Sequence, residues 1–120
     1  MKRNGQNNFQ RGILHLLVML LLKREDMYGY QMVQSISEIT GNRIVTQEGS
    51  LYPVLYKLEE CAYISCKRVQ AGKRLTRLFY HLEESGENEL QNLLQEYGSM
   101  VDGVRMIMEA CGVCLSKEDC

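Results

Sequence analysis

The chain has 120 residues, of which 45% are hydrophobic and 24% are charged, with a single Pro. This length and composition fit one compact domain, and they exclude a disordered chain or a large enzyme with separate cofactor and substrate domains. Residues 1–81 carry twelve Lys and Arg against six Asp and Glu, whereas residues 82–120 carry two against nine. We therefore expect a basic functional surface followed by an acidic appendage.

The longest apolar run, Ile13–Leu22, is interrupted only by His15. It is too short to cross a hydrocarbon layer of about 30 Å, so it predicts a buried helix rather than a membrane span. No small-residue cleavage site follows, because Lys23-Arg24-Glu25-Asp26 comes next. We expect a cytoplasmic protein whose five cysteines are reduced.

Three helices are predicted in the first half of the chain. The first covers Phe9–Lys23 and is apolar on all sides, which indicates a central helix. The second covers Tyr28–Thr40 and is expected to end at a left-handed Gly41. The third covers about Glu48 to Cys61 and must begin near Gly49, because Pro53 is tolerated only near the first turn.

A β-hairpin is predicted next. Tyr63–Gln70 and Lys73–Leu82 form its strands, with Ala71-Gly72 as the turn between them. Residues 67–82 contain no acid, although five basic residues lie there, an excess that is typical of a phosphate-binding surface. These residues are Lys67, Arg68, Lys73, Arg74 and Arg77.

From about Glu83 onward the pattern predicts one long helix. Apolar residues stand at positions 90, 94, 97, 101, 104, 108 and 111, in alternating steps of four and three, and a third row stands at 93, 100 and 107. This stripe is too broad for one two-stranded seam, so we expect it to pack on its own domain and on a partner chain. The predicted domains are therefore residues 1–82, which hold the three helices and the hairpin, and residues 83–120, which form a dimerisation helix with a tail.

The order of elements is that of a mainly α winged helix-turn-helix fold, in which three helices and a β-hairpin wing precede a long C-terminal dimerisation helix. Three motifs refine this prediction: Tyr28-Gly29-Tyr30, the run EGSLYPVL at 48–55 and the run YHLEESG at 80–86. With these motifs the chain resembles the PadR family of bacterial transcriptional regulators from about Arg11 to Gly103. The presence of a single C-terminal helix resembles the compact PadR subgroup, which is similar to regulators that sense multidrug-type compounds.

The resemblance implies that the third helix enters the major groove and that the wing lies along the DNA backbone. On the third helix, Ser50, Tyr52, Tyr56 and Lys57 lie away from the apolar face, and their hydroxyl and ammonium groups suit phosphate. Gln47 and Ser50 have the groups that reach base edges, but one sequence does not separate base contacts from phosphate contacts. The full set of expected DNA-binding residues is Tyr28, Gln47, Ser50, Tyr52, Lys57, Lys73, Arg74 and Arg77.

Three positions depart from the family pattern. Ala62 stands where the family commonly has Gly after the third helix, so we do not expect a left-handed cap there. Gln47 stands where members often have Ser, which makes the preferred operator this chain's own. The drug-binding members typically place a Trp on the last helix, whereas this chain has none, and Tyr97 is the nearest substitute.

We expect a homodimer that binds a pseudo-palindromic DNA operator and acts as a ligand-responsive repressor. The effector would be a small planar hydrophobic molecule held near His15, Tyr97, Met100 and Val101. The alternative is that these residues close against each other as ordinary dimer core.

No nucleophile elbow, phosphate-binding loop, zinc-protease motif or carboxylate pair is present, so neither an enzyme nor a cofactor is expected. Two other functions remain open. The first is a protein-binding adaptor that uses the winged fold for protein contact. The second is a thiol or metal sensor that works through Cys111 and Cys114.

Overall fold

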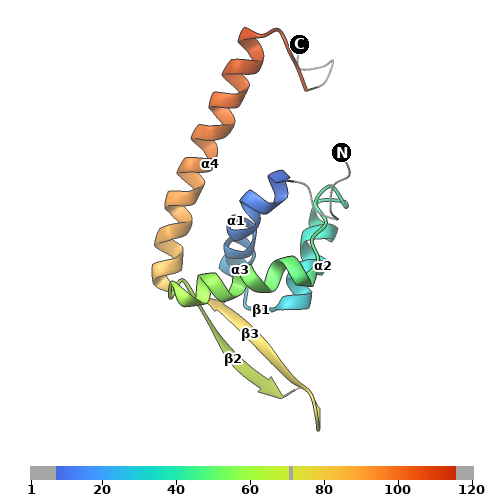
Figure 1. The fold of residues 1–120 in the computed structure, drawn as a ribbon. Coiled ribbons are helices and arrows are strands. Elements are labelled where there is room, and N and C mark those ends of the chain that lie inside the picture. Colours follow the sequence, from blue (N-terminus) through green and yellow to red (C-terminus); the bar gives the residue numbers. More distant parts are fainter. Residues whose placement is uncertain (1–7, 71, 116–120) are drawn as a thin grey trace. The chain divides into compact units, whose positions relative to one another are not determined.

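A computed structural model describes residues 8–70 and 72–115 of the chain. Four helices and three strands follow one another in the order drawn in Figure 1. They are α1 (Asn8–Arg24), β1 (Met27–Tyr28), α2 (Gly29–Ile39), α3 (Glu48–Glu60), β2 (Ile64–Gln70), β3 (Thr76–Leu82) and α4 (Glu84–Ala110). The chain forms two compact units that divide after Leu90, and each is described separately below.

The first unit contains three helices and a three-stranded antiparallel sheet in the order β1-β3-β2. The predicted winged helix-turn-helix arrangement is therefore confirmed, and each predicted helix begins and ends within two residues of the observed one. The short strand β1 was not predicted. It pairs Met27 with Tyr80 and Tyr28 with Phe79, which joins the start of α2 to the base of the wing, the β2–β3 hairpin.

The predicted hairpin turn is too short. Gln70 pairs with Thr76, so β3 begins at Thr76 rather than at Lys73. Gly72 adopts a φ of 125°, a conformation that side-chain-bearing residues avoid. Lys73 and Arg74 therefore lie in the hairpin loop, where their side chains are exposed, and not on a strand.

The core of the first unit lies around α1, which packs against α2, α3 and β3. Leu16, Val18 and Met19 are all buried, although successive helix positions are about 100° apart. This burial on several sides confirms α1 as the central helix. The other elements contribute the rest of the core: Met32, Ile36, Leu51, Leu55, Leu58, Ile64, Tyr80 and Leu82.

The C-terminal end of α3 contradicts the expectation for Ala62. Ala62 has a φ of +64°, which is the left-handed conformation that a glycine would adopt more easily. Its N–H donates to the Glu59 carbonyl at 2.9 Å, and the Tyr63 N–H donates to the Leu58 carbonyl at 3.0 Å. The Ser85 hydroxyl also donates to the Ala62 carbonyl at 2.6 Å. These bonds hold a left-handed cap that the side chain alone disfavours. As predicted, Gly41 after α2 is also left-handed.

The first turns of α4 belong to the first unit. Gly86 and Leu90 are buried there. A Cβ atom on Gly86 would collide with the carbonyl oxygen of Tyr63, so the close approach of α4 to the start of β2 requires a glycine at this position.

The second unit contains the rest of α4 and the segment after it. The predicted apolar stripe is largely exposed: Met100 is 56% accessible and Ile107 is 67% accessible. The chain reverses direction at Gly112, where the Val113 N–H donates to the Met108 carbonyl at 2.9 Å. An apolar hollow of about 540 Å³ lies between the helix and this segment, and its lining includes Met100, Val101, Val104, Met108 and Leu115.

Within the part of the chain that the structure describes, no helix combines the length and the apolar character that a membrane span requires.

Candidate nucleic-acid interface

One face of α3 is packed into the core and the opposite face is polar and open. Leu51, Leu55 and Leu58 are buried. Gln47, Tyr52 and Lys57 are exposed, and Ser50 is half-buried. The predicted division of α3 into a core face and an outward face is therefore confirmed.

Tyr52 links α3 to the start of α2. A Cβ atom on Gly29 would lie 2.7 Å from the Tyr52 hydroxyl oxygen, so the tyrosine ring occupies the space that a side chain at Gly29 would need. Burial, together with the negative charge of Glu48, raises the pKa of Tyr52 above its usual value of 10.0. The hydroxyl therefore stays protonated at neutral pH and remains a hydrogen-bond donor.

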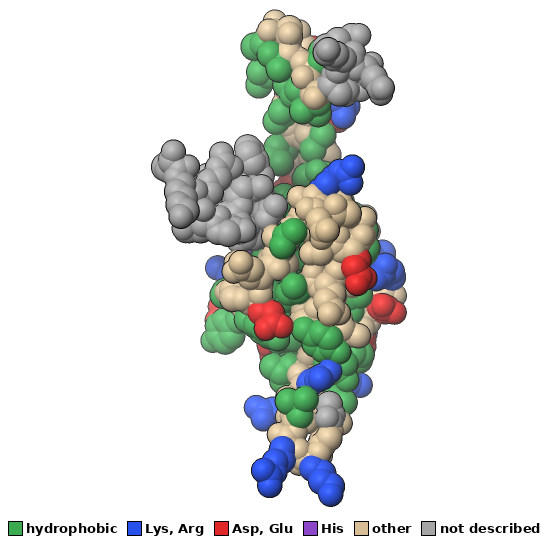
Figure 2. All heavy atoms as spheres, turned by 90° about the vertical axis from the view of Figure 1, so that its right-hand side faces the viewer, with side chains coloured by type: hydrophobic (Ala, Val, Ile, Leu, Met, Phe, Trp, Pro, Cys, Tyr) green, Lys and Arg blue, Asp and Glu red, His purple; other side chains and the backbone are tan. Residues whose placement is uncertain are grey.

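The wing is basic along its length. Lys67 and Arg68 on β2 and Lys73 and Arg74 in the loop are exposed. Figure 2 shows basic side chains gathered over the hairpin at the lower end of the view, with no acidic side chain beside them on this face. The sequence contains no Asp or Glu between Glu60 and Glu83. The wing consequently presents positive charge without internal neutralisation.

An aromatic cluster of Tyr28, Tyr30 and Phe79 lies at the base of the wing. The Tyr28 ring stacks on Tyr30 at 6.0 Å between centroids and meets Phe79 at 4.9 Å. Arg77 on β3 donates from Nη1 to the Tyr30 hydroxyl at 2.9 Å and lies 4.9 Å from that ring's centroid. The structure thus brings the predicted residues Tyr28 and Arg77 together.

Tyr30 and Phe79 were not among the predicted site residues. The signal for Tyr30 was present in the Tyr-Gly-Tyr motif, and β-strand alternation placed Phe79 on the same face as Arg77. On the neighbouring strand, Lys67 lies 5.8 Å from the centroid of the Phe79 ring. The base of the wing is therefore a surface where cations lie over aromatic rings.

A second unpredicted contact also fixes the sheet. His81 on β3 lies 2.8 Å from the Asp26 carboxylate, between Nδ1 and Oδ1. Asp26 immediately precedes β1. The contact therefore ties the α1–β1 connection to the wing.

The predicted effector residues fall in different units. His15 is half-buried on α1, where burial and the positive charge of Lys57 lower its pKa below 6.5. Tyr97, Met100 and Val101 belong to the second unit, in which Met100 and Val101 line the apolar hollow and Tyr97 is exposed.

The cysteines of the CxxC motif are not paired with each other. Cys111 is exposed and free, whereas Cys114 is disulfide-bonded, contrary to the expectation that all cysteines are reduced. Among residues 8–70 and 72–115 there is no group of three or more His, Cys, Asp or Glu side chains that could hold a metal ion.

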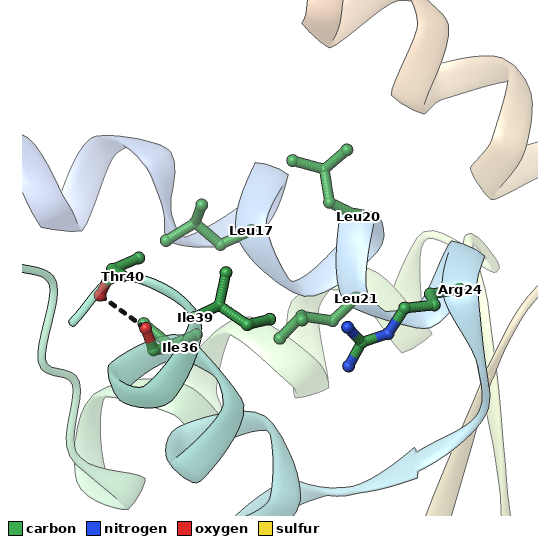
Figure 3. A pocket seen from close by; sticks show the side chains of 7 residues that line it. All are labelled: Leu17, Leu20, Leu21, Arg24, Ile36, Ile39 and Thr40. Atoms are coloured by element: carbon green, nitrogen blue, oxygen red, sulfur yellow. Dashed lines mark hydrogen bonds between the residues drawn. The ribbon is translucent and has the colours of Figure 1, made fainter. Parts of the chain in front are cut away.

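An apolar pocket of about 260 Å³ lies between α1 and α2. Figure 3 shows aliphatic side chains of both helices around it, with the Thr40 hydroxyl bonded at 2.7 Å to the Ile36 carbonyl at its edge. Leu20 and Ile39 line the pocket and are exposed. The lining residues are Leu17, Leu20, Leu21, Arg24, Ile36, Ile39 and Thr40.

Comparison with known proteins places this geometry in a family. Residues 17–92, more than half of the chain, match the model of the transcriptional regulator PadR-like family. The negative transcriptional regulator PadR of Bacillus subtilis is 24% identical over 110 residues, which are 89% of this chain and 60% of that protein.

Two solved structures show the same fold. A transcriptional regulator from Clostridium thermocellum has a TM-score of 0.76 at 23% identity and covers 84% of this chain and 95% of its own. Bacillus subtilis PadR in complex with operator DNA has a TM-score of 0.64 at 27% identity, over 68% of this chain and 47% of its own. Because the family model matches the winged-helix region and continues into α4, the chain belongs to the PadR-like family of transcriptional regulators.

Proposed function

We propose that this regulator binds a DNA operator as a homodimer and represses transcription by occupying it. The observation that carries the proposal is the combination, in one unit, of a polar open face on α3 with a basic wing that has no acidic residues. The related PadR of Bacillus subtilis is a negative regulator, and its solved structure contains operator DNA. Repression by occupying an operator needs no catalysis, and this agrees with a family of transcriptional regulators.

Within this proposal, different residues have different roles. Gln47 and Ser50 at the start of α3 contact base edges in the major groove. Tyr52 and Lys57 contact phosphates beside it, and Lys73 and Arg74 contact phosphates from the wing loop. Tyr28 and Arg77 lie against each other. Together they support the wing and its contact with the DNA backbone. The DNA-binding domain then corresponds to residues 1–82.

The second part of the proposal is an obligate dimer formed through residues 83–120. Tyr97, Met100 and Ile107 on α4 are exposed within one chain. Exposed apolar side chains in such a row favour burial against a partner. We propose that α1 of the second copy, with the exposed Leu20, contributes to that interface. The dimer interface would then bury roughly 2,000 Å² or more, an area that is typical of obligate dimers. Sedimentation at micromolar concentration is expected to show only dimer, and a 13.9 kDa monomer would contradict this.

The third part is an effector response. Two Met residues in the hollow of the second unit, Met100 and Met108, suit planar apolar molecules of varied shape. In the dimer, Tyr97 from each chain and His15 would lie at its border. We expect a planar dye such as Hoechst to bind at micromolar concentration and to weaken operator binding, and Tyr97→Ala to reduce dye binding. Dye binding that is unchanged by Tyr97→Ala would exclude this pocket.

Footprinting on the DNA upstream of the protein's own gene tests the central proposal. The expected result is two protected half-sites about one helical turn apart. The double variant Lys73→Gln and Arg74→Gln should weaken binding to all DNA and reduce the slope of log affinity against log salt by about one unit for each phosphate that the variant no longer neutralises. A folded dimer that binds no DNA would favour the protein-binding adaptor instead.

A further inference from the structure

The pocket between α1 and α2 has an aliphatic wall that is partly open to solvent. Leu17, Leu21 and Ile36 contribute to this wall. Leu20 and Ile39 also line the pocket, although 38% and 61% of their surfaces remain accessible. Exposed apolar side chains beside a hollow gain free energy when an apolar group covers them. The wall therefore favours an occupant with an apolar body.

A single cation stands at one end of the pocket. Of the residues that line it, all of which the structure describes, Arg24 alone is charged. In Figure 3 its guanidinium points towards Leu21. Arg24 Nη2 lies 3.9 Å from Glu25 Oε1, and both side chains are more than half exposed. Because such an exposed ion pair contributes little, the guanidinium is free to bind another anion.

The other polar side chain of the lining, Thr40, is already engaged within the protein. Its hydroxyl donates to the Ile36 carbonyl at 2.7 Å and accepts from the Ile44 N–H at 3.1 Å. A hydroxyl has only one proton, so Thr40 has no donor left for a ligand. The Arg24 guanidinium is therefore the side-chain donor that the pocket offers.

The size and lining of the pocket limit the kind of ligand. Its volume is about 260 Å³, just below the roughly 300 to 1,000 Å³ of sites for drug-sized molecules. None of the seven lining residues in Figure 3 is aromatic, so a flat ring would have nothing to stack on. A short alkyl chain fits these properties better than an aromatic ring system.

The hollow of the second unit differs from this pocket in charge. Its lining includes Arg105 but also Glu109. An anion there would be attracted by one side chain and repelled by the other. A small anion with an apolar body should consequently prefer the pocket between α1 and α2.

We propose that the pocket between α1 and α2 binds a short-chain aliphatic carboxylate. The alkyl chain would cover Leu20 and Ile39, and the carboxylate would bind the Arg24 guanidinium. A guanidinium presents parallel N–H groups that match the two oxygens of a carboxylate. The lining contains no residue of α3 or of the wing, so this inference goes beyond the proposed function and does not depend on DNA binding.

Titration of the whole protein with octanoate, followed by calorimetry in the absence of DNA, tests the site. We expect saturable binding of one octanoate per chain. Each methylene that enters the pocket should strengthen binding about fourfold, so hexanoate should bind roughly sixteenfold more weakly than octanoate. 1-Octanol should bind about tenfold more weakly than octanoate, because it lacks charge-assisted hydrogen bonds to the guanidinium.

Two substitutions of Ile39 separate the effect of charge from a defect in folding. The Ile39 side chain is largely exposed, so neither substitution disturbs the core. Ile39→Glu should weaken octanoate binding about tenfold, because it places a negative charge beside the carboxylate. Ile39→Lys should strengthen binding about threefold for the opposite reason. Equal weakening in both variants would contradict a carboxylate site.

Arg24→Gln and Arg105→Gln form a matched pair. Each arginine lies in an exposed ion pair, 3.9 Å from Glu25 and 3.8 Å from Asp102 respectively. Arg24→Gln should weaken octanoate binding about tenfold, whereas Arg105→Gln should leave it unchanged. If Arg105→Gln removes binding instead, octanoate occupies the hollow of the second unit and the inference is wrong.

Two further results would overturn the inference. Octanol that binds as tightly as octanoate would show that the guanidinium plays no part. Absence of saturable binding would show that the pocket takes no such ligand, for example because a second copy of the chain covers Leu20. The titrations contain no DNA, so none of these results bears on operator binding, and a failure to bind an operator would contradict the proposed function alone.

Discussion

The two ends of α3 are built in opposite ways. At its C-terminal end, Ala62 accepts an unfavourable left-handed φ, two backbone hydrogen bonds close the helix, and Ser85 adds a third bond. At its N-terminal end, Gln47 makes no side-chain cap and Gly49 faces open space. The difference shows that hydrogen bonds from outside the helix fix its C-terminal end, whereas its N-terminal end relies on backbone hydrogen bonds alone, such as those from Ser50 and Leu51 to the Gln47 carbonyl.

The largest effect on the fixed end is expected from Gly86→Ala. The added methyl group would collide with the Tyr63 carbonyl, which follows the left-handed cap directly. We expect the free energy of unfolding to fall by about 2 to 3 kcal/mol. Urea denaturation measures this, with Gly98→Ala as a control, because a methyl group there meets no other atom. Equal stability of the two variants would show that α4 does not need this close contact.

A smaller and opposite effect is expected from Ala62→Gly. Glycine adopts the left-handed conformation without steric cost, although it also gains freedom in the unfolded chain. The net result should be a gain of up to about 1 kcal/mol in stability, with operator affinity unchanged. A loss of stability would mean that the methyl group of Ala62 makes stabilising contacts.

Tyr30→Phe tests the aromatic cluster that connects α2 to the wing. It removes the acceptor of the 2.9 Å bond from Arg77 and retains the ring. Because this bond is exposed, we expect DNA binding to weaken only about two- to threefold, with stability little changed. Fluorescence anisotropy with labelled operator measures it. Tyr97→Phe in the second unit is the control, and equal affinities for the two variants would exclude a role for the bond.

The smallest effect concerns pH. Burial and Lys57 lower the pKa of His15 below 6.5, so the unfolded chain binds a proton at His15 more readily than the folded chain. Stability contributed by neutral His15 is complete above pH 6.5 and declines as the pH falls from 6.5 towards the lower folded-state pKa. Urea midpoints at pH 7.5 and pH 5.5 should differ less in His15→Gln than in the unmodified protein. An identical pH dependence in both would contradict the lowered pKa.

Much of the fold was predictable because the spacing of apolar residues along the sequence indicates which positions are buried. The buried positions Leu51, Leu55 and Leu58 fixed the phase of α3, and the motif beginning at Glu48 indicated the family. The hairpin loop was predicted incorrectly because Gly72 marks a turn without setting the register, which depends on the pairing of Gln70 with Thr76.

The unpredicted features depend on contacts between distant residues. The Arg77–Tyr30 bond joins residues 47 apart in the sequence, and the His81–Asp26 contact joins residues 55 apart. Neither has a local signal. The left-handed Ala62 likewise has no local signal, and the Ser85 hydroxyl that bonds to its carbonyl comes from α4, 23 residues further along the chain.

The pairing of strand β3 makes the base of the wing more rigid than its end. Its residues Phe79 and Tyr80 lie between two strands, with partners on β1 as well as on β2, whereas Thr76 to Leu78 pair with β2 alone. Amide hydrogens near the loop should therefore exchange with solvent faster than those at the base, and trypsin should cut first at Lys73 and Arg74, which lie beyond the paired strands. The end of the wing can then adapt to the DNA backbone, while the half anchored by β1 keeps its orientation relative to α2.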